Sequence, residues 1–444
     1  MARPIGIDLF AGAGGLSLGF EQAGFDIAAA VEIDPVHAAT HDFNFPRCTT
    51  IALSVTRLTG AEIRRLAGIG ERPVSVVFGG APCQGFSMMG QRALDDPRNA
   101  LVRDFVRLVR ELDADYFVFE NVKGITVGKH RQFLNEIIEA FEAAGYQVRQ
   151  PWRVLNAANY GTPQSRERLI LFGSKLGLEL PEYPSAQCSI AGSLRDATGL
   201  APGPTCRDAL GDLPDAEAYR RLSAADVVKA KYGKPSAYAA GLRGLVRPEG
   251  DFSYPRVWDA TLMTSSMRTE HTDLSRKRFA ETGEGEVEPV SRFFRLPSGG
   301  VSNTLRAGTD SARGAFTSPR PIHYQYPRCI TVREMARLHG FPDWFRLHQT
   351  KWHGARQIGN AVPPPLAKAV AAEIIKAMGV KPSVPKRALA LGDAALLTLD
   401  MGEAAAHYGI GVPIAQRVRR EVAALSKNSS GASSTRLDSL HGGT

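Results

Sequence analysis

Apolar runs and amphipathic stretches alternate through residues 1–176. Five apolar runs, PIGIDLF, IAAAVEID, VSVVFGG, YFVFEN and RLILFGS, predict buried β-strands. The stretches LSLGFEQAG, NALVRDFVRLVRELD and QFLNEIIEAFEAAG have the apolar spacing of amphipathic helices. The alternation predicts an α/β fold with an open, mostly parallel sheet and helices on both faces. Such sheets bind ligands at the carboxyl ends of their strands, where we look for a site first.

The alternation stops after residue 176. Residues 177–327 are rich in proline and glycine, as in LAPGPTCRDALGDLP and RLPSGGVSNTLRAGTD, and predict a second, smaller, loop-rich domain. Helical patterns return within residues 328–379, in TVREMARLHGFPDWF and PPPLAKAVAAEIIKAM. Residues 380–444 form a C-terminal extension whose polar end we expect to be disordered. Its stretch EAAAHYGIGVPIAQRVRR is either an ordinary packing helix or a helix–turn–helix fragment that contacts DNA or a partner.

Composition excludes some classes of protein. The chain has 444 residues, of which 43% are apolar, so it can build real cores. It has no apolar run of about 18 residues, which a transmembrane helix needs, and its first residues do not resemble a secretory signal. The five cysteines show no CxxC pairing and no His/Cys cluster. We therefore expect a cytoplasmic protein without a disulfide framework or a structural zinc.

The charge favours a polyanionic partner. The chain carries 54 Lys and Arg against 45 Asp and Glu, a formal charge of +9. Between Arg292 and Arg333 there are seven arginines and one acidic residue, Asp310, so this segment has a net charge of +6. It is either a solvated loop region or, because arginine without lysine favours bidentate contacts, a surface that binds phosphates or guanine edges.

A first group of candidate residues suggests a cofactor site. Residues 8–20, DLFAGAGGLSLGF, read as a strand, a glycine-rich turn and the start of a helix, where backbone N–H groups attract negative groups. Glu32 and Asp34 end the next strand, the place where such folds hold ribose hydroxyls. Together they indicate an adenosine-containing cofactor without a pyrophosphate, or else a plain turn with a capping acid.

A second group suggests covalent catalysis. Cys83 follows the strand-like RPVSVVFGG on a loop of small residues, Glu120 ends another apolar strand, and QSRER presents Arg166 and Arg168 on one side of an extended segment. Taken singly, these read as an inert thiol and surface arginines. Together they suit addition of a thiolate to an electron-poor ring such as cytosine, with a carboxylic acid protonating the ring nitrogen and a cation at the carbonyl. The addition makes C5 nucleophilic enough to take a methyl group from a sulfonium.

These stretches occur in a known order. DLFAGAGGLSLGF, GGAPCQGFS, FENVKG, NYGTPQSRERLILFG, TVREMARLHGFPD and QIGNAVPPPLA resemble six motifs of the bacterial DNA (cytosine-5)-methyltransferases, and the resemblance covers nearly all of residues 5–376. It implies the fold of the S-adenosylmethionine-dependent methyltransferases, a Rossmann-like doubly wound mixed sheet with a target-recognition domain at 177–327. Residues 328–379 then belong to the catalytic domain, together with residues 1–176.

The resemblance also implies roles for single residues. Cys83 would be the nucleophile, Glu120 would protonate cytosine N3, Arg168 would contact the base carbonyl and the nucleophile, and Arg166 would support the loop. Glu32 would bind the cofactor's ribose and Ile33 its adenine. The other expected cofactor contacts are Phe10, Gly12, Gly14, Leu16, Pro82, Asn360 and Val362. Ser54 stands where the family often has an aspartate on the adenine amino group. The expected DNA contacts are Gln84, Ser87, Arg292, Thr304, Leu305, Arg306 and Arg313.

The resemblance implies partners as well. We expect double-stranded DNA as substrate, a separate restriction endonuclease as a possible companion, and a monomeric enzyme. The alternatives are an RNA cytosine-5 methyltransferase on the same scaffold and a catalytically silent DNA-binding relative. The tRNA-directed branch has a Cys-Phe-Thr signature that this chain lacks, and silent relatives usually lose the Pro-Cys pair or the glutamate, which are both present. A nicotinamide oxidoreductase fits least, because the glycine pattern differs and Cys83 would have no role.

Overall fold

The first strands and helices alternate as the sequence predicts. The computed structural model describes residues 3–82, 94, 96, 99–128, 130–193, 199–309 and 318–412. The strands of the main sheet are β1 (Ile5–Leu9), β2 (Asp26–Val31), β3 (Thr49–Ile51), β4 (Val76–Gly79), β5 (Tyr116–Val122), β6 (Tyr146–Val148), β7 (Arg153–Asn156) and β8 (Glu167–Lys175). The helices between them are α1 (Gly15–Ala23), α2 (Pro35–Asn44), α3 (Gly60–Leu66), α4 (Ala100–Glu111) and α5 (His130–Ala143).

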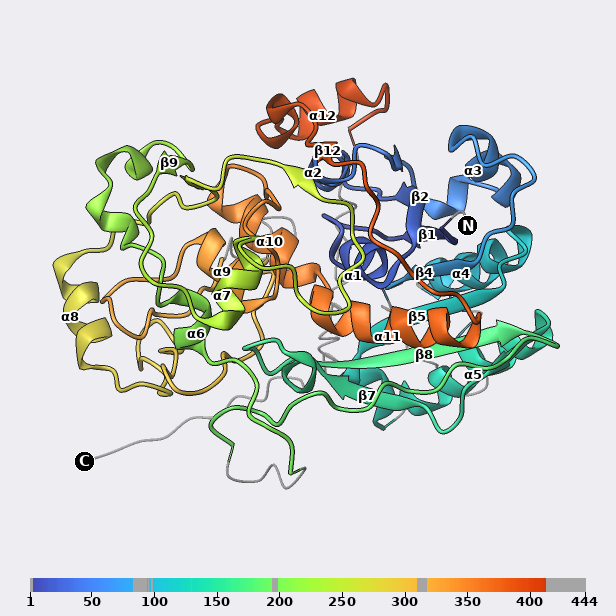
Figure 1. Cartoon of the computed structure of the whole chain (residues 1–444), viewed down its shortest axis with the longest axis horizontal. Coiled ribbons are helices and arrows are strands. Elements are labelled where there is room, and N and C mark those ends of the chain that lie inside the picture. The colour runs from blue at the N-terminus through green and yellow to red at the C-terminus, as the bar shows by residue number, and fades with distance from the viewer. Residues whose placement is uncertain are drawn as a thin grey trace, which may run out of the picture. The chain divides into compact units, whose positions relative to one another are not determined.

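The sheet is mixed and doubly wound, which confirms the predicted fold class. Its strand order is β3-β2-β1-β4-β5-β8-β6, with β7 also paired to β8 (Figure 1). Strands β1 to β5 are parallel, whereas β8 runs antiparallel to β5, β6 and β7. The order reverses between β1 and β4, so the loops that follow these two strands diverge there and leave room for a ligand.

Alternate residues of each strand face two different cores. On β4 and β5, Val77 and Phe117 belong to a core with α3, α4 and α5, whereas Phe78 and Val118 belong to a core with α1 and the late helix α11 (Pro364–Ala377). This period of two explains why the strands read as continuous apolar runs, since both faces are covered.

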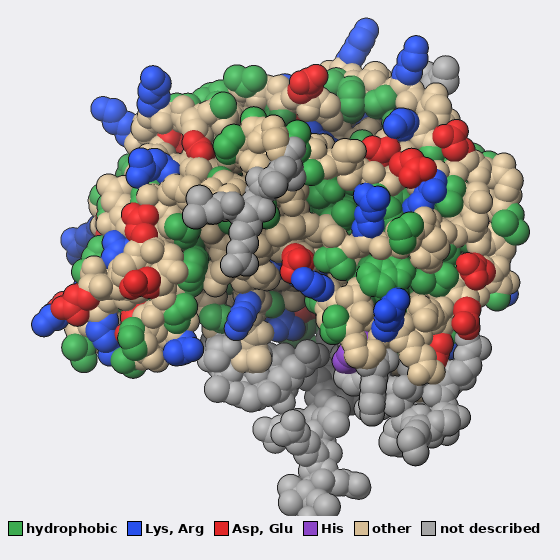
Figure 2. Space-filling view, turned by 90° about the horizontal axis from the view of Figure 1, so that it is seen from below, with side chains coloured by type: hydrophobic (Ala, Val, Ile, Leu, Met, Phe, Trp, Pro, Cys, Tyr) green, Lys and Arg blue, Asp and Glu red, His purple; other side chains and the backbone are tan. Residues whose placement is uncertain are grey.

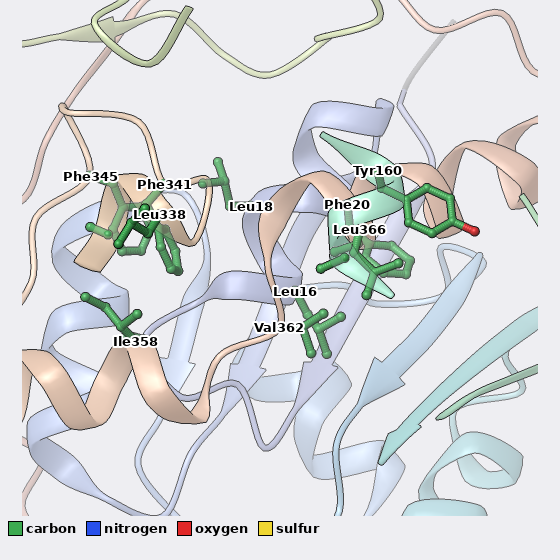
Figure 3. Close-up of a cluster of buried hydrophobic side chains, with 14 of the residues drawn as sticks. Leu16, Leu18, Phe20, Tyr160, Leu338, Phe341, Phe345, Ile358, Val362 and Leu366 are labelled. Atoms are coloured by element: carbon green, nitrogen blue, oxygen red, sulfur yellow. The ribbon is translucent and has the colours of Figure 1, made fainter. Parts of the chain in front are cut away.

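Helix α11 packs very closely on α1. A Cβ added to Gly19 would lie 2.3 Å from the Cβ of Ala367, and one added to Gly15 would lie 2.5 Å from the carbonyl oxygen of Val362. Figure 3 shows Val362 beside Leu16 and Leu366 beside Phe20 in the same cluster. The glycines of the first motif therefore serve helix packing as well as the turn.

The loop-rich part of the chain has few regular elements, as predicted. It contains α6 (Cys206–Leu210), β9 (Val228–Lys229), α7 (Ala237–Leu242), β10 (Arg256–Val257), β11 (Leu262–Met263) and α8 (Asp273–Glu281). It is followed by α9 (Val332–Leu338), α10 (Lys351–Asn360) and α11, then by β12 (Leu389–Ala390) and α12 (Met401–His407). Leu210 and Leu296 share one core cluster with Phe20 and Phe78, so the core is continuous across the boundaries predicted at 177 and 328.

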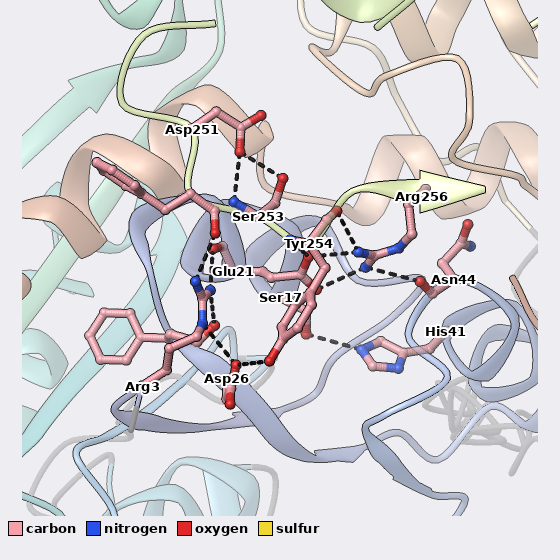
Figure 4. A network of polar contacts seen from close by, with 12 residues as sticks. Arg3, Ser17, Glu21, Asp26, His41, Asn44, Asp251, Ser253, Tyr254 and Arg256 are labelled. Atoms are coloured by element: carbon pink, nitrogen blue, oxygen red, sulfur yellow. Dashed lines mark hydrogen bonds and ion pairs between the residues drawn. The ribbon is translucent and has the colours of Figure 1, made fainter. Parts of the chain in front are cut away.

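A polar network joins the loop-rich part to the start of the sheet. Arg256 forms a two-pronged ion pair with Glu21 of α1, and the hydroxyl of Tyr254 donates to Asp26, which also pairs with Arg3 (Figure 4). Beyond α11, β12 pairs in parallel with β10, and α12 packs on α2. Residues 389–407 of the C-terminal extension are thus packed against both the loop-rich part, through β12, and the catalytic part, through α12.

The described residues hold no helix that is long and apolar enough to cross a membrane. Within the same residues, no group of three or more His, Cys, Asp and Glu is arranged to hold a metal ion.

Candidate active site

The glycine turn after β1 forms one side of the candidate site. Phe10, Gly12 and Gly14 all have positive φ angles, of 65°, 56° and 103°. This conformation is strained for Phe10 but not for the glycines, and strained backbone clusters at functional sites. A Cβ added to Gly12 would meet nothing within 4 Å, so open space lies beside its backbone. The turn can therefore admit a ligand close to the main chain.

Glu32 spans this turn from the end of β2. Its Oε2 accepts a hydrogen bond from the N–H of Gly12 and its Oε1 accepts one from the N–H of Asp34, both at 2.8 Å. Burial raises the pKa of the Glu32 carboxyl, although the nearby His37 and these two N–H groups oppose the shift. Each oxygen keeps a second lone pair, so the carboxylate can still accept from a ligand hydroxyl. The adjacent Ile33 is 54% exposed, and an apolar ring could lie on it.

The other predicted cofactor contacts surround the same strand ends. Val362 is buried against α1, and Asn360 is exposed at the end of α10. Ser54 follows β3 and uses its hydroxyl locally, accepting from the N–H of Thr56 at 3.3 Å. Pro82 is exposed after β4. An adenosine-type ligand fits these residues. The exposed side chain of Ile33 can pack on an adenine ring, the Glu32 carboxylate can accept from ribose hydroxyls, and the open backbone at Gly12 leaves space for the ligand.

A buried polar chain lies beneath the glycine turn, and the sequence reading missed it. Asp8, on β1, is fully buried, and its Oδ2 accepts a hydrogen bond from the hydroxyl of Ser17 at 2.6 Å. That hydroxyl also lies 3.0 Å from Nε2 of His41, a contact drawn in Figure 4. Burial raises the pKa of Asp8 to about 8 and lowers that of His41 to about 3, so both groups are neutral at pH 7. An aspartate directly before a ligand turn was the available signal.

The predicted general acid lies against the loop that leads to Cys83. A Cβ added to Gly80 would be 2.5 Å from Oε2 of Glu120, so this carboxyl packs on the backbone between β4 and Cys83. The neighbouring Asn121 donates from Nδ2 to the carbonyl oxygen of Ala81 at 3.0 Å, which fixes the same loop. The structure thus brings the Glu-Asn pair of β5 to the last described residues before Cys83.

Arg168, on β8, forms an ion pair with Glu120 on the neighbouring strand β5. Its Nε lies 2.8 Å from Oε1 of Glu120, and both side chains are only 12–13% exposed. Burial raises the pKa of Glu120, and the charges of Arg168 and Arg166 only partly offset this. The carboxyl is therefore oriented by a cation yet remains easier to protonate than an exposed glutamate, as a general acid requires.

Arg166 has a different position from Arg168. It is 1% exposed, and its guanidinium donates to the carbonyl oxygens of Leu305, Gly359 and Ala361 at 2.7–2.9 Å. Burial lowers its pKa to about 9. These bonds tie the residue just before β8 to the end of the loop-rich region and to the segment before α11. The geometry favours the supporting role expected for Arg166 over contact with a substrate.

Four of the predicted DNA contacts meet at one pocket. Arg292, Thr304, Leu305 and Arg306 line a cavity of about 270 Å³, and the side chains of Arg292, Thr304 and Arg306 are exposed. Leu305, by contrast, is 1% exposed within the core, while its N–H donates to Gln164. The side chain of Leu305 is thus anchored in the core and positions the exposed Thr304 and Arg306 on either side of it, while its own DNA contact stays a prediction. Four predicted site residues lie outside the described residues: Cys83, Gln84, Ser87 and Arg313.

The surface shows how the net positive charge is distributed. On the face in Figure 2, acidic and basic side chains are interspersed rather than segregated. Several arginines between residues 292 and 333 are not free for DNA. Arg295 and Arg328, for example, are bound to backbone carbonyls or carboxylates within the fold. The excess of arginine between 292 and 333 is thus partly structural.

Comparison with known proteins identifies the family. Residues 6–376 match the family model described as C-5 cytosine-specific DNA methylase. The chain belongs to this family. It is 60% identical over 422 residues to the type II methyltransferase M.XorII of Xanthomonas oryzae pv. oryzae, covering 95% of this chain and 96% of that protein. It is 34% identical to M1.HphI of Haemophilus parahaemolyticus, covering 83% and 86% of the two chains.

A solved structure supports the assignment. The putative DNA modification methyltransferase of an Escherichia coli prophage superimposes with a TM-score of 0.67 at 33% identity, covering 85% of this chain and 99% of that one. The protein is therefore a DNA (cytosine-5)-methyltransferase, and its family and fold imply methyl transfer from S-adenosylmethionine. The family description names DNA, which favours DNA over the RNA alternative.

Proposed function

We propose that this methyltransferase modifies one cytosine within a specific duplex sequence, as the modification enzyme of a restriction-modification system. The relatives named above are type II methyltransferases, which supports this assignment. The loop-rich region, with exposed arginines at one pocket, supplies a surface for the duplex. In this proposal the enzyme acts as a monomer, and any cognate endonuclease acts separately.

The proposed chemistry begins with the target cytosine rotated out of the helix, because a stacked base hides C6 from any side chain. The Cys83 thiolate then adds to C6 while Glu120 protonates N3, which gives C5 the electron density of an enamine carbon. S-adenosylmethionine supplies an electrophilic methyl group on its sulfonium sulfur. After C5 is methylated, a water molecule takes the C5 proton, the Cys83 sulfur leaves C6 as the thiolate, and N3 returns its proton to the Glu120 carboxylate, which restores the C5–C6 double bond and the enzyme.

One observation carries this proposal: the Glu120 carboxyl packs against the Gly80 backbone, three residues before Cys83. Its raised pKa lets it hold a proton for N3, and Arg168 at 2.8 Å fixes its orientation. We propose that the remaining guanidinium N–H groups of Arg168 face the base carbonyl. Glu32 and Ile33 would hold the cofactor's ribose and adenine, and Gln84 and Ser87 would contact the DNA beside the flipped base.

The covalent step can be tested by trapping. In 5-fluorocytosine at the target, fluorine replaces the C5 proton, and no base can remove it as F⁺. Elimination is therefore blocked, and the Cys83 adduct should persist with wild-type enzyme and S-adenosylmethionine. Cys83→Ser should give no adduct while still binding DNA. Cys188→Ser is the matched control, since serine can keep the hydrogen bond that this buried thiol gives to Ala158. The mechanism is refuted if the wild type leaves no adduct, or if Cys83→Ser still forms one.

The role of Glu120 needs a kinetic test. Glu120→Gln keeps the shape and the hydrogen bond to Arg168 but cannot donate an acidic proton to N3. We expect single-turnover methylation to slow by roughly 10²-fold or more. An unchanged single-turnover rate would mean that another acid protonates the base.

A further inference from the structure

A hairpin in the loop-rich region has an unusual arginine. Val287 and Phe294 form an antiparallel bridge, and the N–H of Arg292 donates to the carbonyl oxygen of Glu288 at 2.9 Å. Arg292 closes this turn with a φ of 62°, in the left-handed region. Glycine or asparagine is the usual residue at such a position, and a bulky side chain there costs free energy. Strained residues of this kind are concentrated at sites where the side chain is used.

The buried carboxylate of Glu288 holds the hairpin loop in place. The carboxylate of Glu288 is 1% exposed, and it accepts from the N–H of Val290 and from both the N–H and the hydroxyl of Ser291. Arg278, on α8, completes this arrangement with its Nε 3.3 Å from Glu288. The backbone at the tip is therefore fixed before any ligand binds, so little conformational entropy is lost on binding.

The tip presents one free cation and one apolar side chain. The side chain of Arg292 is exposed and has no hydrogen-bond or ion-pair partner among the described residues, whereas that of the nearby Arg295 donates to four backbone carbonyls. Val290, two residues before Arg292, is 66% exposed. Arg292 also lines the 270 Å³ pocket together with Thr304 and Arg306. The segment of Thr304 and Arg306 is hydrogen-bonded to Ser165, just before β8.

We propose that the hairpin 287–294 enters the major groove of the substrate duplex and that Arg292 reads a guanine there, donating to O6 and N7. The major groove admits a two-stranded ribbon, and a bidentate arginine is the commonest specific contact to guanine. A rigid, strained loop suits a directional base contact, whereas a phosphate contact needs only a mobile positive charge. Arg306 then serves as a phosphate contact. This inference rests on the proposed function, and it identifies a residue that sets the sequence specificity.

The test compares four enzymes: wild type, Arg292→Lys, Arg292→Gly and Arg306→Ala. Arg292→Lys keeps the positive charge but lacks the planar pair of guanidinium N–H donors. Arg292→Gly removes the side chain and relieves the strain of the positive φ. Bisulfite sequencing of a methylated plasmid library gives the sequence context of every modified cytosine. We expect both Arg292 variants to lose discrimination at one guanine position by roughly 5- to 150-fold, whereas Arg306→Ala keeps the wild-type context.

Duplex affinity is measured as well, so that variants without methylation activity can also be compared. The duplex carries 7-deazaguanine, which lacks N7, at that guanine. Wild type and Arg306→Ala should lose affinity for it, and Arg292→Gly, which has no side-chain donor, should bind both duplexes equally. The inference is overturned if Arg292→Gly keeps the wild-type context, or if it still discriminates against 7-deazaguanine. If the wild type makes no 5-methylcytosine at all, the proposed function fails instead.

Discussion

Replacing Asp8 by Asn should change how the stability of this protein depends on pH. Asp8 is buried beneath the cofactor turn, where Ser17 hydrogen-bonds to Oδ2 and Oδ1 has no partner among the described residues. Burial raises its pKa from 3.8 to about 8, the hydrogen bonds from Ser17 oppose the shift, and the charge of Glu32 adds to it. Asn has the same shape, and its amide oxygen can accept the hydrogen bond that the Ser17 hydroxyl donates to Oδ2 of Asp8.

The magnitude follows from proton linkage. Between pH 3.8 and about 8 the folded chain keeps the Asp8 proton and the unfolded chain loses it. The free energy of unfolding therefore falls by about 1.4 kcal/mol per pH unit from this group as the pH rises. His41 has the opposite effect, since burial lowers its pKa from 6.5 to about 3. The neutral His41 contributes its full stabilisation of the folded chain above pH 6.5, and this contribution is lost as the pH falls below 6.5. The two effects offset each other below pH 6.5, and only the loss from Asp8 remains above it.

The assay is urea unfolding of wild type and Asp8→Asn at pH 5.5, 6.5 and 7.5. The stability of the variant relative to wild type should increase by roughly 2–3 kcal/mol over these two pH units, and all other titrating groups cancel in the difference. His41→Gln is the control, because its pH-dependent difference from wild type should appear only below pH 6.5. Parallel curves for Asp8→Asn and wild type would show that Asp8 is ionised in the folded state and would refute the reasoning.

Three further substitutions test the packing and the DNA surface. Arg166→Met should lower the free energy of unfolding by about 2 kcal/mol, because three charge-assisted hydrogen bonds outweigh the relieved burial of a charge; unchanged urea unfolding would contradict this. Gly19→Ala should destabilise by about 1–2 kcal/mol, since its Cβ would lie 2.3 Å from Ala367. Gly402→Ala, which has space in α12, is the control and should not destabilise. Arg306→Ala should weaken duplex binding and lower the slope of affinity against salt by up to roughly one unit. An unaltered slope would mean that Arg306 does not touch phosphate.

Sequence patterns predicted the strands that are buried on both faces and the main helices that pack on them. The runs that became β4, β5 and β8 are apolar on both faces, and the helices α1, α4 and α5 have apolar positions at helical spacing, so local pattern was sufficient. The short helix α3 was missed, because only Gly60 and Ile63 of its residues are buried and its apolar pattern is weak. The antiparallel direction of β8 did not follow from its residues, since direction depends on the pairing partner.

The candidate site divides in the same way. By itself the sequence determined which chemistry is present: a thiol, a carboxyl and two arginines beside predicted strand ends, in the motif order of one family. Only the tertiary structure decided which groups touch. It paired Arg168 with Glu120 and buried Arg166 among backbone carbonyls and Leu305 in the core. It also placed the exposed side chain of Arg292 on a strained turn, without a partner among the described residues. The physical reason is that residue type fixes what a side chain can do, whereas burial and neighbours distant in sequence fix its pKa, its partners and its access to a ligand.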